Sequence, residues 1–255
     1  MTKDELKSFL DFKALQYENS SFVLDDPILI PKQFTHKKDI EITGLITATF
    51  SWGNRKSIIK SGMKLNELFD YNPFAFISQY GGNKSEKKLL KQFVHRTFNF
   101  EDLDFFIRSL NKIYARHDSL ESIFYGNDTF EKIANFRAVF LSTKHGEKSV
   151  KHLPDVQRGS AAKRINMMLR WFCRDNSPVD FGIWKTVSKA ELLLPLDVHT
   201  GNISRKLGLL KRNQNDRKAV EEITERLKEL NPLDPVKYDF ALFGIGAYEK
   251  EFNKD

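Results

Sequence analysis

The sequence predicts an all-α protein, and two observations carry this prediction. The first is the spacing of apolar residues, which recur every three or four positions in most segments of the chain. The clearest stripe lies in residues 101–116 and consists of Leu103, Phe106, Ile107, Leu110, Ile113 and Tyr114. The second is that no segment alternates apolar and polar residues over the length of a strand. Together they indicate a protein built from packed amphipathic helices.

The same spacing places the individual helices. We expect helices, or the starts of helices, at residues 3–17, 38–51, 55–69, from 73, 101–116, 119–125, 129–141, 161–173, from 198, 216–230 and from 235. Pro27 and Pro31 predict a linker over residues 25–31, and Gly81 and Gly82 predict a flexible break. The segment 93–99 is expected to be a loop or short turn. The chain is therefore expected to be a series of helices joined by loops.

Composition bounds the class of protein. A chain of 255 residues with 40% hydrophobic and 29% charged residues can bury a substantial core and is typical of a soluble globular protein. No apolar run approaches the roughly 20 residues needed to span a membrane, and residues 1–10 do not resemble a signal peptide. The one cysteine, Cys173, excludes an internal disulfide framework and a four-cysteine iron–sulfur cluster. We expect a cytoplasmic protein.

Positive charge is concentrated in two segments. The formal net charge is +7, but residues 1–50 carry a net charge of −2. Residues 144–174 contain eight Lys or Arg against two acidic residues, and residues 202–218 contain six against one. A solvated helix face would explain either segment alone. Because the two segments flank one candidate site, they fit a surface for a nucleic-acid phosphate backbone better.

That candidate site is the segment 159–210, in which Lys163 and Asp197 stand at helix starts. A neutral lysine can attack an electrophilic sugar or carbonyl carbon and form a Schiff base. An ionised aspartate can stabilise a positive transition state. Each residue also has an ordinary interpretation: Lys163 as a solvated or phosphate-contacting lysine, and Asp197 as a helix N-cap. The spacing alone leaves both interpretations open.

Other polar features point less clearly to chemistry. Residues 50–55 form a polar and aromatic turn between two helices, with Trp52 either packed or approaching a ligand. His95 and Arg96 are expected to be structural hydrogen-bonding residues. The six histidines show no ligand spacing with carboxylates, so we predict no metal site and give a metal hydrolase the lowest rank.

Two segments resemble the helix–hairpin–helix DNA glycosylases. Residues 159–169 resemble the end of the hairpin and the start of the second helix, where a catalytic lysine follows a glycine-flanked hairpin. Residues 196–199 and 205–209 resemble the segment that carries the catalytic aspartate, and residues 45–55 are similar to the helix and loop that insert near the lesion. The separation of Lys163 and Asp197, 34 residues, is similar to that in archaeal 8-oxoguanine DNA glycosylases.

The whole chain also resembles an uncharacterised bacterial family of unknown function that is related to those enzymes. The resemblance lies in six elements, which are Asn72-Pro73-Phe74 and residues 94–99, 159–174, 179–185, 195–201 and 234–246. It covers most of the chain but implies no activity of its own.

The glycosylase resemblance implies a two-lobed helical domain with a helix–hairpin–helix element. Lobe one would comprise residues 46–174, and lobe two residues 1–45 with 175–255. Lys163 would attack C1′ of a flipped nucleotide, and Asp197 would stabilise the developing positive charge. The DNA backbone would be held by Arg158, Gly159, Ser160, Ala161, Arg164, His199 and Arg205. The base pocket or the wedge in the duplex would come from Trp52, Asn54, Arg55, Phe181, Trp184, Asp239 and Phe243, although Trp184 and Phe243 would serve equally well in the core.

The chain departs from the family pattern at two points. The usual second glycine of the hairpin is missing, since Ser160 and Ala161 follow Gly159, and Val198 replaces the usual threonine. With these departures, the resemblance still implies a monomeric, cofactor-free DNA glycosylase and abasic-site lyase, associated with the nucleoid and acting on an oxidised purine, with 8-oxoguanine as the first candidate. The partner would be double-stranded DNA containing a damaged base, with no membrane involved. The alternative is a non-catalytic DNA- or RNA-binding protein on the same scaffold.

Overall fold

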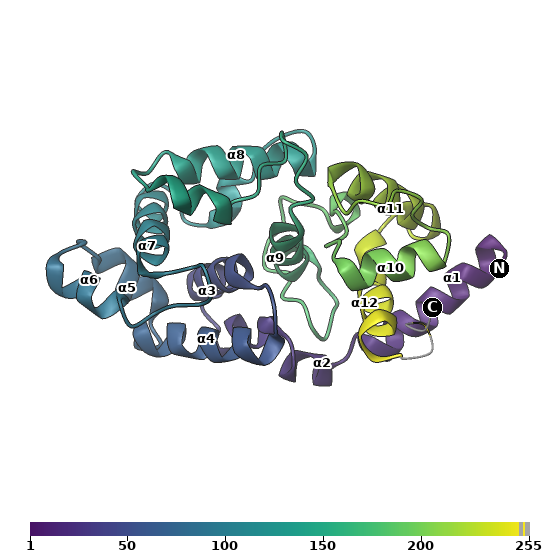
Figure 1. Ribbon diagram of the computed structural model, residues 1–255, viewed down its shortest axis with the longest axis horizontal. Helices are drawn as coiled ribbons and strands as arrows, with labels where there is room; N and C mark the ends of the chain where they lie inside the picture. The colour runs from purple at the N-terminus through teal and green to yellow at the C-terminus, as the bar shows by residue number, and fades with distance from the viewer. Residues whose placement is uncertain (250–251, 253–255) are drawn as a thin grey trace. The chain divides into compact units, whose positions relative to one another are not determined.

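The computed structural model describes residues 1–249 and 252 and confirms the all-α class. Within these residues the regular elements are helices, and the sole β-bridge is an isolated one between His95 and Phe98. The α-helices are α1 (Lys3–Tyr17), α2 (Ser20–Leu24), α3 (Lys37–Phe50), α4 (Arg55–Leu68), α5 (Pro73–Gln79), α6 (Lys84–Leu90), α7 (Phe100–Tyr114), α8 (Thr129–Leu141), α9 (Lys163–Cys173), α10 (Val198–Lys206), α11 (Arg217–Leu230) and α12 (Tyr238–Tyr248) (Figure 1). Six short 3-10 helices connect them: η1 (Pro27–Leu29), η2 (Pro31–Gln33), η3 (Leu120–Ile123), η4 (Glu147–His152), η5 (Lys189–Glu191) and η6 (Pro235–Lys237).

Most long helices lie where the apolar spacing predicts them, with ends that differ by one or two residues. The expected helix at 119–125 is instead the 3-10 helix η3. The reason is Glu41, a fully buried residue of α3, whose carboxylate accepts the Leu120 N–H and the Ser119 hydroxyl. The expected linker 25–31 contains η1 and the start of η2, and α6 follows the predicted glycine break directly.

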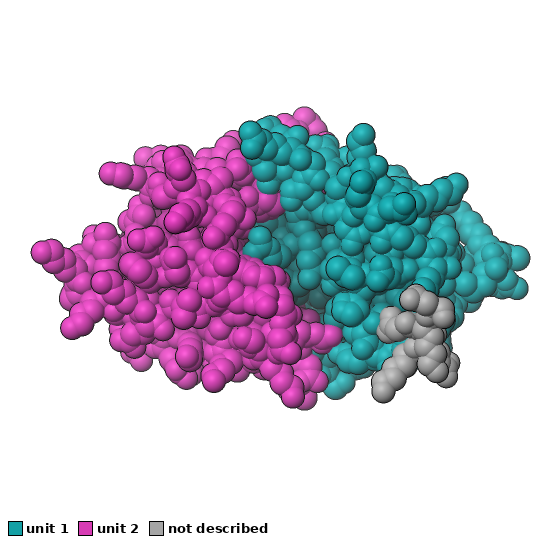
Figure 2. All heavy atoms as spheres, in the orientation of Figure 1, with its two compact units in different colours: residues 1–22, 155–255 teal, residues 23–154 magenta. Residues whose placement is uncertain are grey.

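The chain divides into two compact units. Unit 1 comprises residues 1–22 and 155–255, and unit 2 comprises residues 23–154 (Figure 2). This division differs from the expected lobes, whose boundaries were 45/46 and 174/175. A boundary at 45/46 would cut α3, and α9 packs with unit 1 rather than unit 2.

In unit 2 the central element is α3. Every residue of α3 from Ile40 to Phe50 is buried, including Glu41 and three threonines. Thr43 and Thr49 donate their hydroxyls to backbone carbonyls of the preceding turn, at 2.6 and 2.8 Å, so their burial leaves no hydroxyl proton without an acceptor. Helices α4 and α5 and the two 3-10 helices before α3 pack around it.

In unit 1 the central element is α12, on which α1 and α10 both pack (Figure 1). Small residues of α12 allow this close approach. A Cβ atom on Gly244 would overlap the Tyr17 ring of α1, and one on Gly246 would lie 3.0 Å from the His199 Cβ of α10. The helix predicted from residue 235 onward is therefore the packing centre of its unit.

Candidate functional site

Lys163 is the first residue of α9, and a turn over residues 155–162 leads into it. Ala162, the N-cap residue, has a φ of +49°, a left-handed conformation that alanine adopts rarely. Asn166, fully buried one turn into α9, donates from Nδ2 to the Ala161 carbonyl at 3.0 Å. The turn is thus tied to the helix that follows it, and the backbone of Lys163 is held in place.

Asp197 is the N-cap of α10 and faces Lys163. Its Oδ1 accepts the Thr200 N–H at 2.9 Å, and the Thr200 hydroxyl accepts the Asp197 N–H at 2.7 Å, which forms a capping box. Its Oδ2 lies 3.5 Å from Nζ of Lys163. The side chain of Lys163 is 35% exposed and that of Asp197 is 17% exposed. The fold therefore brings together, partly open to solvent, two residues that lie 34 positions apart in the sequence.

The loop before α11 connects to both sides of this pair. The Arg217 N–H donates to the Gly159 carbonyl of the turn at 2.9 Å. Asn215 donates from Nδ2 to the Asp197 carbonyl at 2.8 Å, and its Oδ1 accepts from Arg205 at 2.6 Å. Residues 213–217, which we call the bracket loop, thus link the start of α9 to the start of α10 and hold the two at a fixed separation. Sequence reasoning missed Asn215 and assigned Arg205 to DNA.

Arg170 and Asp239 form a buried ion pair in the same unit as Lys163. Arg170, two turns along α9 from Lys163, donates Nη1 to Oδ2 of Asp239 on α12 and lies 3.3 Å from Asp180. Burial raises the pKa of Asp239 to about 6; Arg170 opposes this rise and Asp197 adds to it. The predicted site residue Asp239 is therefore near enough to the Lys163–Asp197 pair to respond to its charges.

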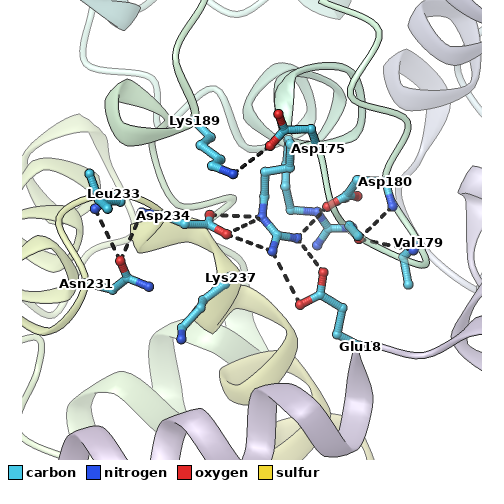
Figure 3. A network of polar contacts seen from close by, with 12 residues as sticks. Glu18, Asp175, Val179, Asp180, Lys189, Asn231, Leu233, Asp234 and Lys237 are labelled. Carbon is cyan, nitrogen blue, oxygen red and sulfur yellow. Dashed lines mark hydrogen bonds and ion pairs between the residues drawn. The ribbon is translucent and has the colours of Figure 1, made fainter.

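Arg174 is the centre of a second set of buried ion pairs. Its guanidinium binds Glu18 at 2.8 Å, Asp180 at 2.7 Å and Asp234 at 2.9 Å. Figure 3 shows the three carboxylates converging from different segments. Burial alone would lower the pKa of Arg174, but the three carboxylates raise it. Burial also raises the pKa of Asp180, which the two arginines partly offset.

The burial of these arginines has a signal in the sequence. Arg170 and Arg174 lie four residues apart on either side of the apolar run Trp171-Phe172-Cys173, and both are 3% exposed. Charged residues are rarely buried unless they are paired, so their position predicts acidic partners elsewhere in the chain. Nothing in the sequence shows which carboxylates those are.

The aromatic pocket candidates have different surroundings. Trp184 is 1% exposed and packs against Phe172 of α9 with ring centroids 4.9 Å apart, so it lies in the core. Phe181 is partly exposed and lies 6.4 Å from the same ring. Phe243 is partly exposed on α12, and its ring meets His199 edge-on at 6.0 Å. The structure therefore leaves Phe181 and Phe243 as side chains that a ligand can reach.

The predicted backbone-binding residues also differ in their surroundings. Arg158 is exposed at the turn. Arg164 is partly buried, and burial lowers its pKa to about 10. His199 places Nδ1 3.1 Å from the Gly246 carbonyl. Arg205 donates to the Arg212 carbonyl at 2.8 Å as well as to the bracket loop, so it has a structural role at this site.

The predicted wedge residues lie in unit 2. Trp52 stacks on His152 with ring centroids 5.8 Å apart and meets His95 edge-on at 5.7 Å, as the packed-tryptophan alternative predicts. Asn54 caps α4 through its side-chain oxygen. Arg55 donates to the Asp25 carbonyl at 3.4 Å. Whether they enter a duplex remains a prediction.

The described part of the chain offers neither a metal site nor a membrane-spanning helix. None of the groups of His, Cys, Asp and Glu in that part of the chain is suited to hold a metal ion. No helix there is both long enough and apolar enough to cross a membrane.

The fold and site define an all-helical protein with a lysine and an aspartate facing each other at two helix N-termini. Residues 26–248 match the model of a family described as "Protein of unknown function (DUF2400)", and the chain belongs to this family. No match was found among curated proteins or among solved structures.

Proposed function

We propose that this protein is a DNA N-glycosylase with abasic-site lyase activity that acts through a Schiff base on Lys163. The observation that carries the proposal is the 3.5 Å approach of Lys163 Nζ to Asp197 Oδ2, with both residues fixed at helix starts by their own local hydrogen bonds. The resemblance of the two segments to helix–hairpin–helix glycosylases supplies the reaction class. A helix–hairpin–helix element has an α-helix on each side of its hairpin, but the element before this turn is the short 3-10 helix η4. That these segments act as a helix–hairpin–helix element is therefore also part of the proposal.

The chemistry follows from the positions of the two side chains. Lys163 first loses its ammonium proton to water. Its neutral amine then attacks C1′ of a flipped nucleotide, and the electron pair of the glycosidic bond leaves with the base. The departing base takes up a proton from the amine, and opening of the sugar ring gives an imine on Nζ. Loss of a C2′ proton to water then expels the 3′ phosphate, which cleaves the strand. The Asp197 carboxylate stabilises the positive charge that develops on the sugar.

The proposed substrate is an oxidised purine, with 8-oxoguanine the first compound to test. Support comes from Phe243 and Phe181, which are partly exposed aromatic side chains of the same unit as Lys163 and so are the first candidates to stack on a flipped base. Arg170, Arg174 and Arg205 are bound internally, but other basic residues of the segments 144–174 and 202–218 are exposed and support a polyanionic partner, among them Arg158, Lys211 and Lys218.

Borohydride trapping tests the reaction. Borohydride reduces an imine to a stable amine, so the protein would be linked covalently to DNA. We expect an adduct on an abasic-site duplex and on an 8-oxoguanine duplex from the native protein, and none from Lys163→Gln. Lys228→Gln, a partly exposed lysine in the last turn of α11, is the matched control and should form the adduct normally. Asp197→Asn should slow base release by roughly 100-fold or more.

The outcomes separate the two functional classes. An adduct only on the abasic duplex would support the lyase step and leave the base to be identified. If neither duplex gives an adduct while duplex binding still depends on salt, the catalytic proposal is wrong. A non-catalytic nucleic-acid-binding protein on this scaffold then becomes the better description.

A further inference from the structure

Several cations of unit 2 are paired with acidic residues. Lys37 lies 3.2 Å from Glu121, and Lys38 lies 3.6 Å from Asp118. Arg108 lies 2.8 Å from Asp104. These charges are therefore at least partly neutralised within the unit itself.

Helix α4 is different. Lys56, Lys60 and Lys64 follow one another at intervals of four residues, so they project from one side of the helix. All three are exposed, and within the described residues none makes an ion pair. We call these three residues the α4 lysine row. The one acidic residue of α4, Glu67, lies in its last turn.

The start of α4 shows that this arrangement is unfavourable for the helix itself. Its first turn contains Arg55 and Lys56 and no acidic residue. The N-terminus of a helix carries a partial positive charge, so cations there destabilise the helix. Lysines four residues apart also repel one another along the helix, so an anionic partner outside the helix would stabilise the row.

Helix α6 and the residue that follows it add further exposed lysines to unit 2. These four lysines, Lys84, Lys87, Lys88 and Lys91, are all exposed. The acidic residue of α6, Glu86, accepts the backbone N–H groups of Gly81 and Asn83 and so serves the helix cap. A shallow hollow of about 310 Å³ joins the end of α4 to the end of α6 and is lined by Lys64, Glu67, Leu68, Leu89, Gln92 and Phe93. The hollow therefore brings the end of α6 close to Lys64, the last residue of the α4 lysine row.

We propose that α4 and α6 form a second contact surface for the phosphate backbone of duplex DNA, located in unit 2 and distinct from the Lys163 site. Residues four apart in a helix are separated by about 6 Å along its axis, so the α4 lysine row spans about 12 Å. Duplex DNA presents roughly seven phosphate charges over that length. Long flexible lysines without internal partners suit a repeating polyanion better than a single small anion. The choice of DNA as the partner rests on the proposed function.

The test is the salt dependence of binding. The triple variant Lys56→Gln, Lys60→Gln, Lys64→Gln keeps good helix formers at exposed positions, so the fold should be retained, which circular dichroism would check. The control removes the same charge from paired lysines of unit 1, as Lys3→Gln, Lys7→Gln, Lys228→Gln. Binding to an undamaged duplex is measured by fluorescence anisotropy between 50 and 200 mM salt, with the Lys163→Gln background in every protein.

Each lysine that neutralises a phosphate contributes about 0.9 to the slope of log affinity against log salt. We expect the slope of the row variant to be about 2.7 smaller in magnitude than the native slope. A fourfold rise in salt should then weaken binding by the row variant roughly 40-fold less than it weakens binding by the native protein. The control should keep the native slope. An unchanged slope in the row variant would overturn the proposal, as would a change seen only with anionic vesicles or with RNA.

Borohydride trapping on an abasic duplex, done with Lys163 intact, distinguishes this proposal from the proposed function. The row variant should still form the adduct at saturating DNA and low salt. An adduct together with an unaltered slope would reject the surface and keep the enzyme. A reduced slope without any adduct from the native protein would keep the surface and reject the enzyme.

Discussion

Asp197 uses its two carboxylate oxygens for different purposes. Oδ1 satisfies the backbone N–H of Thr200 and so holds the start of α10, while Oδ2 faces Lys163. The capping role and the proposed chemical role, which the sequence left as alternatives, are thus compatible in one residue. An aspartate fixed by a capping box also has few rotamers left, which favours a precise position relative to the lysine.

Asp239 leads to a prediction on pH and stability. Its pKa is raised from an ordinary aspartate value to about 6, so between about pH 4 and 6 the folded protein holds a proton that the unfolded chain has lost. Stability contributed by this proton is present at low pH and is lost as the pH rises through 6. We expect the difference in unfolding free energy between native protein and Asp239→Asn to fall, by on the order of 2 kcal/mol, from pH 4 to pH 7.

Urea unfolding at several pH values measures this difference. Carboxylates with lowered pKa values, such as Asp216, impose the opposite trend on both proteins and cancel in the comparison. A difference that rises with pH would mean that the ion pair with Arg170 outweighs burial and that the pKa of Asp239 is depressed instead.

At the scale of single residues, the sequence predicted Lys163 and Asp197 as the candidate site but not the residues that hold them in place. Lys163 and Asp197 stood out because each lies at a helix start and in a recognisable segment. The supporting residues Asn215 and Arg170 did not, because their partners lie 18 and 69 residues away in the sequence. A hydrogen bond to a backbone carbonyl leaves no pattern in a single sequence.

At the scale of elements, the start of α10 depends on the close approach of the bracket loop to one glycine. A Cβ atom on Gly201 would lie 2.8 Å from Oδ1 of Asn215 and 2.9 Å from Nη1 of Arg205. Because these two side chains carry the contact from the loop to Asp197, the absence of a side chain at this position is a structural requirement. Helix periodicity predicts neither this requirement nor the 3-10 form of η3, since both are imposed by neighbouring segments.

Gly201→Ala tests the bracket. In an open helix this change would stabilise by up to about 1 kcal/mol, but here we expect a loss of about 1–2 kcal/mol because Asn215 must move away from Asp197. Urea unfolding would show the loss, and the rate of adduct formation on an abasic duplex should fall with it. Gly146→Ala is the control, since its Cβ would meet no atom within 4 Å.

A double variant tests whether Gly201 and Asn215 act through the same contact. Asn215→Ala removes the side chain that the new methyl group would meet, so the two changes should be less than additive. Full additivity would show that Gly201 and Asn215 act independently and that the bracket is not the cause.

At the scale of the whole molecule, unit 1 is discontinuous in sequence: residues 1–22 fold with residues 155–255. That residues 1–45 would belong with residues 175–255 was implied only by the glycosylase resemblance, and not by the apolar spacing, which predicts the helices but not their partners. The reason lies in α12, whose glycines admit α1, and in an arginine that binds carboxylates from three separate segments. Such long-range partners cannot be paired from a single sequence.

Arg174 provides the test of this organisation. Its guanidinium joins Glu18 at the end of α1, Asp180 after α9 and Asp234 before η6. Arg174→Lys keeps the charge but cannot reach three carboxylates, and it leaves the fully buried Asp180 with Arg170 alone. We expect the free energy of unfolding, measured with urea, to fall by about 3 kcal/mol in Arg174→Lys and by about 1 kcal/mol in Glu18→Gln, whose side chain is less buried.

Limited proteolysis tests where the structure opens. In Glu18→Gln the protease should cut first after α1, because that variant loses the ion pair at the end of this helix while the pairs to Asp180 and Asp234 remain. Equal losses in the two variants, with α1 no more accessible to protease than in the native protein, would show that Arg174 stabilises its own neighbourhood and does not hold the N-terminal segment to the rest of unit 1.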